Sequence, residues 1–220
     1  MTLSISKCAV QFSVATAVAV VLLCGGTQAQ EKEAEFKPLF NGKDLSGWEV
    51  SENPASVVVE DGALITHGER AHAFYVGDDG KASFKNFHLK AKVKTAEGAN
   101  SGIYFHTEFQ EKGWPSKGYE CQVNNTQKDP KKTGGLYAVQ DNFEAPVKDD
   151  VWFDYDIIVE GKHVIVKING KTISDYTEPD DVEREESMAD RLIGSGTFAL
   201  QAHDPGSKVW FKEIMVKTLP

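Results

Sequence analysis

Residues 118–125 (GYECQVNN) place a carboxylate and two amides at alternate positions, namely Glu120, Gln122 and Asn124. Side chains alternate along an extended chain, so these three share one face of a predicted strand, opposite Tyr119, Cys121 and Val123. Amides beside a lone carboxylate form directional hydrogen bonds to hydroxyl groups. The pattern favours a sugar-binding face, and the alternative is an ordinary solvated outer face.

Two other predicted strands repeat this polar pattern. Tyr104, His106 and Glu108 share a face in one, and Gln201 and His203 share a face in the other, with Asp204 next along the chain. Glu108 or Asp204 is the candidate source of a second carboxylate. If the three strands are neighbours, one concave sheet gathers His106, Glu120, Gln122, Gln201 and His203. These types supply a base, an acid and hydroxyl-binding groups.

Trp114 lies in a loop rich in glycine and proline, residues 111–116 (EKGWPS). Aromatic faces stack on sugar rings, so we expect Trp114 to contact substrate, and the alternative is that it caps the edge of the domain. His67, Arg70 and His72 follow no metal motif and are interpreted as surface or loop-anchoring residues. A divalent cation bridging histidine and glutamate is an open alternative that no ligand spacing supports, so the cofactor is unknown.

The elements that must position these residues are nearly all strands. Asp61-Gly62 and Asn169-Gly170 predict tight hairpin turns. Short turn-separated strands across about 190 residues predict an all-β sandwich of two antiparallel sheets. The predicted strands are residues 57–60, 63–66, 87–94, 103–107, 119–124, 135–139, 152–160, 163–168, 197–203 and 209–216. Residues 180–192 are highly charged and predict a short helix or acidic loop with a solvated role.

Composition restricts the partners. The net charge is −9 and no basic cluster occurs, which excludes nucleic acid and anionic membrane surfaces as expected partners and favours a neutral carbohydrate. Apart from Cys8 and Cys24 near the N-terminus, Cys121 is the sole cysteine, so no disulfide is expected within the domain. The oligomeric state is not predicted.

Residues 1–29 are typical of an export signal, with Lys7, an apolar run and small residues before Gln30. We therefore expect a periplasmic or extracellular protein. A membrane anchor, and a lipoprotein signal ending at Cys24, are the alternatives. A polar spacer, residues 30–35, would precede a single domain over residues 36–220.

Five blocks together resemble the signature of the 3-keto-disaccharide hydrolase family, also called DUF1080. They are residues 40–48 (FNGKDLSGW), residues 101–105 (SGIYF), Tyr119-Glu120-x-Gln122, Trp152 and Leu200-Gln201-x-His203-Asp204. The resemblance spans nearly all of residues 36–217. It implies a concanavalin A-like jelly-roll sandwich related to glucanases and lectins, acting on glycosides whose sugar is oxidised to a ketone at carbon 3.

A ketone at carbon 3 changes the chemistry that the site must supply. Ordinary glycoside hydrolysis uses two carboxyl groups, whereas a 3-keto sugar has an acidic hydrogen on carbon 2 that one base can remove. The hypothesis assigns Glu120 as the base and His203 or His106 as acid or electrophile. Gln122, Gln201, Tyr104, Trp114, Asn124 and Asp204 are the expected substrate-binding residues.

Three places depart from the family pattern: Asn125 where aspartate is common, Phe153 where asparagine is common, and Lys212-Glu213 where an Arg-Asn pair is usual. These changes leave altered substrate choice and loss of catalysis as alternatives. A carbohydrate-binding module without catalysis is the rival hypothesis, in which Glu120 is one more hydrogen-bond acceptor.

Overall fold

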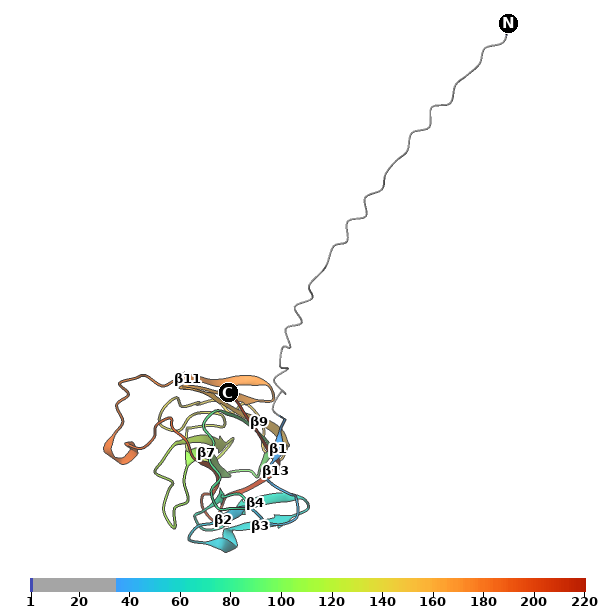
Figure 1. The fold of residues 1–220 in the computed structure, drawn as a ribbon. Helices are drawn as coiled ribbons and strands as arrows, with labels where there is room; N and C mark the ends of the chain where they lie inside the picture. The colour runs from blue at the N-terminus through green and yellow to red at the C-terminus, as the bar shows by residue number, and fades with distance from the viewer. Residues whose placement is uncertain (2–34) are drawn as a thin grey trace. The chain divides into compact units, whose positions relative to one another are not determined.

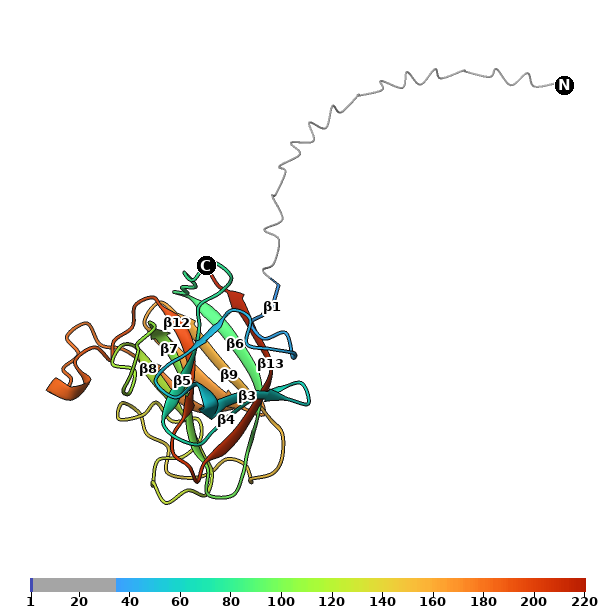
Figure 2. The same cartoon turned by 90° about the horizontal axis from the view of Figure 1, so that it is seen from below.

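Extended chain makes up almost all regular structure in the computed structural model, which describes Met1 and residues 35–220. Apart from their first and last residues, the predicted export signal (residues 1–29) and spacer (residues 30–35) lie outside the described residues. The strands pair into two antiparallel sheets, one of eight strands and one of five (Figures 1 and 2). This arrangement confirms the predicted all-β sandwich.

The larger sheet has the order β11-β10-β9-β6-β13-β4-β3, and β1 also pairs with β13. Its strands are β1 (Lys37–Pro38), β3 (Val57–Glu60), β4 (Ala63–His67), β6 (Phe87–Thr95), β9 (Phe153–Glu160), β10 (His163–Ile168), β11 (Lys171–Thr177) and β13 (Lys208–Thr218). The β3–β4 and β10–β11 turns fall at Asp61-Gly62 and Asn169-Gly170, as predicted.

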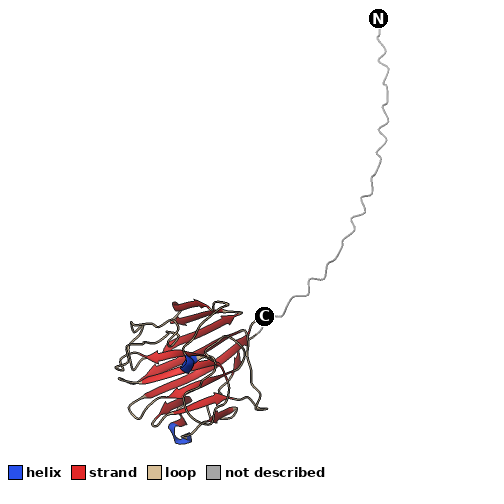
Figure 3. Cartoon of the chain, turned by 90° about the vertical axis from the view of Figure 1, so that its left-hand side faces the viewer, coloured by secondary structure: helices blue, strands red, loops and turns tan. Residues whose placement is uncertain are grey.

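The smaller sheet has the order β2-β5-β12-β7-β8. Its strands are β2 (Trp48–Val50), β5 (Ala71–Tyr75), β7 (Asn100–Thr107), β8 (Tyr119–Asn124) and β12 (Thr197–Ala202). Two short 3₁₀ helices, η1 (Pro54–Ser56) and η2 (Glu186–Met188), are the only helices among the described residues (Figure 3). No helix in that part of the chain is long and apolar enough to cross a membrane.

The hydrophobic core lies between the two sheets and fixes which side chains face outward. Tyr119, Cys121 and Val123 of β8 belong to one buried cluster with residues of β9 such as Tyr155 and Ile157. Because β8 alternates, Glu120 and Gln122 lie on its opposite face, away from the larger sheet. The polar face inferred from the sequence is therefore the outer face of the smaller sheet.

Two sequence-based expectations about elements are wrong. Residues 135–139 are not a strand: Leu136 and Gln140 exchange backbone hydrogen bonds of 3.0 and 2.9 Å and close a tight loop. The segment 180–192 is not wholly solvated, because Arg191 is buried within it. Strand β5 had no clear signal in the sequence, since both of its faces are covered and its residues do not alternate in polarity.

Candidate active site

A cavity of about 480 Å³ lies on the outer face of the smaller sheet. Strands β7, β8 and β12 form its floor, and the β7–β8, β8–β9, β11–β12 and β12–β13 connections form its walls. Among its lining residues are Asn100, Tyr104, Glu120, Gln122 and Gln201 from the strands, and Trp114, Asp129, Tyr137, Met188, Arg191 and His203 from the loops. The predicted adjacency of the three strands is confirmed, because β7 pairs with both β8 and β12.

Glu120 lies on this floor with only 5% of its surface exposed. Gln201 Nε2 donates a hydrogen bond of 3.2 Å to Glu120 Oε1, and Arg191 Nη2 lies 3.6 Å from Oε2. Burial raises the pKa of Glu120 above its ordinary value, and the positive charge of Arg191 opposes that rise. A carboxylate with a raised pKa is a stronger base once it is ionised.

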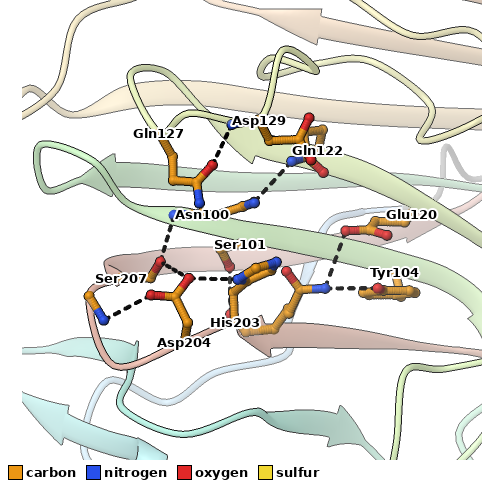
Figure 4. A network of polar contacts seen from close by, with 12 residues as sticks. Asn100, Ser101, Tyr104, Glu120, Gln122, Gln127, Asp129, His203, Asp204 and Ser207 are labelled. Atoms are coloured by element: carbon orange, nitrogen blue, oxygen red, sulfur yellow. Dashed lines mark hydrogen bonds and ion pairs between the residues drawn. The ribbon is translucent and has the colours of Figure 1, made fainter.

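Two glutamine side chains present free acceptors beside Glu120. Gln201 Nε2 also donates to the Tyr104 hydroxyl at 2.8 Å, and Gln122 Nε2 donates to Asn100 Oδ1 at 2.9 Å (Figure 4). The Oε1 atoms of both glutamines are buried without a partner among the described residues. Buried polar atoms are normally paired, so these two oxygens are available to ligand hydroxyl groups.

His203 is held in one orientation by its neighbour in the chain. Its Nδ1 lies 2.6 Å from Asp204 Oδ2, which also accepts a hydrogen bond of 2.9 Å from Ser207 Oγ (Figure 4). Burial raises the pKa of Asp204, but hydrogen bonds from His203 and Ser207 outweigh it and hold that pKa below its usual value. Asp204 is therefore ionised, His203 Nδ1 carries a hydrogen, and Nε2 is the atom left for proton transfer.

Trp114 stands against this histidine at the wall of the cavity. The two ring centroids are 5.3 Å apart with an interplanar angle of 37°, and Trp114 keeps 43% of its surface exposed. An exposed aromatic face in a polar cavity suits stacking on a sugar ring.

His106 is not in the cavity, and the expectation that it shares a face with Tyr104 is wrong. The β7–β12 register runs from Thr107 directly to Phe105, so His106 is the extra residue of a bulge and has a φ of 55°. Its Nε2 donates to the Lys85 carbonyl oxygen at 2.8 Å, and its Nδ1 accepts from the Gly194 N–H at 3.2 Å. Burial lowers the pKa of His106, so it is a neutral structural residue.

Two predicted substrate-binding residues do not line the cavity. Asn124 Nδ2 donates to the carbonyl oxygens of Asp129 and Lys131, which fixes the loop after β8. Asp204 supports His203 as described above. Asn124 and Asp204 therefore lie outside the set of side chains that face the cavity.

The departures from the family pattern also lie elsewhere. Asn125 bonds to Thr95 and Thr133, and Phe153 is buried in the core. Lys212 lies over the Trp152 ring on the larger sheet, with its Nζ 4.3 Å from the ring centroid. None of these residues lines the cavity.

Arg191, Tyr137 and Met188 are among the lining residues that were not predicted from the sequence. Arg191 and Tyr137 come from loops and Met188 ends the short helix η2, so no periodicity exists to predict their direction. The one available signal for Arg191 was its place in the strongly acidic segment 180–192, where the charge pattern pointed to solvent instead. Among the described residues, no group of three or more His, Cys, Asp or Glu side chains is arranged to hold a metal ion.

Comparisons with solved structures agree on the fold. A candidate glycosyl hydrolase from Parabacteroides distasonis ATCC 8503 superposes with a TM-score of 0.71 over 84% of this chain and 94% of that one, at 24% identity. A Bacillus subtilis protein with a galectin-like fold gives a TM-score of 0.53 over 84% of this chain and 94% of the other, at 12% identity. These likenesses confirm the concanavalin A-like jelly-roll architecture.

Comparisons with known sequences show which family this chain belongs to. A 3-keto-disaccharide hydrolase from Bacteroides thetaiotaomicron is 32% identical over 74 residues, covering 30% of this chain and 26% of that protein. This chain thus matches only about a quarter of that relative's length. The match to the family profile is far longer and covers residues 35–217. The chain belongs to the family of 3-keto-alpha-glucoside-1,2-lyase-like domains.

Proposed function

We propose that this protein cleaves glycosides of 3-keto sugars by base-initiated elimination, with water adding back to the product. The observation that carries the proposal is the isolation of Glu120 on the cavity floor. Asp129 also lines the cavity, but it belongs to the loop after β8, where its carbonyl oxygen accepts a hydrogen bond from Asn124 Nδ2, and not to the floor strand. The floor strand therefore lacks the second carboxylate of an ordinary glycosidase, which stands about 5 to 10 Å from the first.

The proposed reaction begins with Glu120. Its carboxylate takes the proton from carbon 2 of the sugar, which the neighbouring ketone makes acidic. Electrons move onto the ketone oxygen, giving an enolate. When they return, a double bond forms between carbons 1 and 2 and the bond from carbon 1 to the leaving oxygen breaks. His203 enters this step as the imidazolium and protonates that oxygen from Nε2, keeping the Nδ1 hydrogen that it shares with Asp204.

The remaining predicted residues bind the sugar in this proposal. The unpaired Oε1 atoms of Gln122 and Gln201 accept hydrogen bonds from ring hydroxyls, and Trp114 stacks on the sugar face. Tyr104 anchors Gln201 through its hydroxyl. Carbohydrate is therefore the expected ligand class, and the export signal inferred from residues 1–29 would bring the protein to sugars outside the cytoplasm.

Incubation with 3-keto-trehalose tests this function. We expect wild-type protein to release glucose and to form a conjugated enone or its hydrate, measured by mass spectrometry and ultraviolet absorbance, with no product from unoxidised trehalose. Glu120→Gln should lower kcat at least about 100-fold, because the base is lost. Glu108→Gln is the matched control, since its carboxylate is exposed and pairs with Lys117.

Two outcomes would contradict the proposal. Turnover by Glu120→Gln at the wild-type rate would remove Glu120 from the mechanism. Saturable binding of the 3-keto sugar by wild-type protein without any product would favour a non-catalytic binding module instead.

A further inference from the structure

The proposed elimination needs three protein groups, but only one of the two predicted histidines, His203, lines the cavity. A base must take the carbon 2 proton, an acid must protonate the leaving oxygen, and a donor must stabilise the negative ketone oxygen. Glu120 and His203 fill the first two roles. Because His106 lies outside the cavity, the third role lacks an assigned residue.

Arg191 is placed for that role. Its Nη2 lies 3.6 Å from Glu120 Oε2, and only 9% of its side chain is exposed. Its other terminal nitrogen, Nη1, is buried and has no hydrogen-bond partner among the described residues, although the side chain lines the cavity. A buried guanidinium nitrogen without a partner is costly, and a ligand oxygen would satisfy it.

The backbone around Arg191 is fixed by several hydrogen bonds. Its carbonyl oxygen accepts a bond of 3.0 Å from Arg184 Nε, and the neighbouring Asp190 carbonyl accepts one of 3.0 Å from the Gly118 N–H. Arg184 Nη2 in turn donates to the hydroxyls of Tyr119 and Tyr176 at 2.8 and 2.9 Å. Arg191 is thus held over the floor by contacts from β8 and β11.

We propose, on the basis of the function above, that Arg191 is the catalytic electrophile of this site. The carbon that loses its proton to Glu120 is bonded to the ketone carbon, so the ketone oxygen must lie within a few ångströms of the Glu120 carboxylate. Arg191 is the cation beside that carboxylate. Its N–H groups donate to the oxygen as the electron pair arrives there and keep their protons throughout.

An arginine is suited to stabilising the enolate oxygen but not to protonating the leaving oxygen. The guanidinium is charged at all physiological pH values and does not give up a proton, so it stabilises an enolate without protonating the leaving group. His203 remains the proton donor. Glu120 gains one proton and His203 loses one, so charge and atoms balance before water adds.

Arg191 also acts on the base. The titratable or charged groups facing Glu120 are Tyr104 from β7, His203 after β12 and Arg191 itself, with Cys121 and Tyr155 on the core side of β8. Removing the guanidinium takes away the largest effect that opposes burial, so the pKa of Glu120 should rise and the acid limb of the pH–rate profile should move to higher pH.

The test compares two substrates that differ in their leaving groups, a 4-nitrophenyl and a methyl 3-keto-α-glucoside. We expect Arg191→Met to lower kcat by about 100- to 1,000-fold on both, because enolate stabilisation precedes departure of the group. His203→Ala should affect the methyl glycoside much more than the 4-nitrophenyl one, since nitrophenolate needs no acid. Arg191→Lys should recover part of the lost rate.

Controls separate this inference from the proposed function. Lys171→Met removes one exposed positive charge from β11 and should leave kcat unchanged. Circular dichroism checks that each variant folds, and Arg191→Gln replaces Arg191→Met if the latter does not. If wild type turns over the substrates and folded Arg191→Met has the same kcat and pH profile as wild type, the role of Arg191 is overturned and the proposed function stands. No turnover by wild type on either substrate overturns the proposed function and this role together.

Discussion

Gly102 determines where the Glu120 carboxylate lies. The two residues lie on the neighbouring strands β7 and β8, and a Cβ atom added at Gly102 would lie 2.6 Å from Glu120 Oε1 and 2.9 Å from its Cγ. Contacts that short do not occur, so any larger residue here displaces the base. The space above Gly102 is thus part of what keeps Glu120 near Gln201 and Arg191.

Gly102→Ala should therefore reduce kcat/KM by about 10- to 100-fold, because a shift of about 1 Å in a catalytic group is enough for such a loss. The fold should persist, since the displaced group is a side chain on the open face of the sheet. Steady-state kinetics on 3-keto-trehalose measure the effect. Gly194→Ala is the matched control, as nothing lies within 4 Å of its added Cβ. Activity within twofold of wild type in Gly102→Ala would contradict this account of the floor.

At the scale of elements, alternation along a strand predicted much of the site. It placed Glu120 and Gln122 opposite Cys121, and Gln201 opposite Leu200, because one face of each strand packs in the core. It failed at His106, where a bulge inserts one residue and reverses the direction of the side chain. Sequence periodicity carries no information about such an insertion.

Loops were the other limit of prediction. Trp114 was inferred from its residue type and its glycine- and proline-rich loop, whereas Arg191 reaches the cavity only because distant elements hold its loop. The β7–β8 and β7–β12 pairings that gather the floor are contacts between residues far apart in sequence. Turn chemistry at Asp61-Gly62 fixes a local hairpin, but it does not specify which strands become neighbours across the sheet.

The segment between β11 and β12 should depend on the Tyr119 hydroxyl, which donates to Glu178 and accepts from Arg184. Tyr119→Phe leaves a buried carboxylate with one fewer donor, so we expect a loss of about 1–3 kcal/mol in the free energy of unfolding. Amide exchange in residues 184–193 should quicken, and kcat should fall as Arg191 loses its position. Hydrogen-exchange mass spectrometry measures the exchange rates of residues 184–193 directly.

Tyr176→Phe is the matched control for this prediction. It removes one acceptor of Arg184 but leaves Glu178 bonded to Tyr119 and to the Ile193 N–H. We expect amide exchange in residues 184–193 to change less in Tyr176→Phe than in Tyr119→Phe. Equal protection of residues 184–193 in wild type and Tyr119→Phe would show that the segment is held by other contacts.

At the scale of the whole molecule, the two outer faces of the sandwich differ in character. The larger sheet carries lysines and ion pairs such as Lys92 with Asp154, as expected for a solvated face. The smaller sheet instead buries polar groups under loops, including His72 of β5, which was interpreted from the sequence as a surface or loop-anchoring residue. His72 is fully buried, and neither of its ring nitrogens has a partner among the described residues. Burying this imidazole on the smaller sheet therefore has a cost in stability.

That cost should appear as acid sensitivity of the whole fold. Burial lowers the pKa of His72 to about 3 from an ordinary 6.5, with the Glu52 charge opposing the shift. The folded state thus binds fewer protons than the unfolded state, so this contribution is fully present above about pH 6.5 and is lost as pH falls toward 3. At pH 4 the free energy of unfolding should be lower by about 2–3 kcal/mol than at pH 7 from this group alone.

Urea denaturation of wild type and His72→Phe at pH 7, 5 and 4 isolates this contribution, because all other titrating groups are common to both proteins. The variant keeps an aromatic ring between Tyr104 and Trp114, whose centroids lie 5.4 and 5.7 Å from that of His72. Its unfolding free energy should fall less steeply with acid than that of wild type. His67→Phe, at a half-buried position on β4, should follow the wild-type curve. Parallel curves for wild type and His72→Phe would mean that His72 already has a polar partner in solution. The cover over the smaller sheet would then be more open to water than its packing implies.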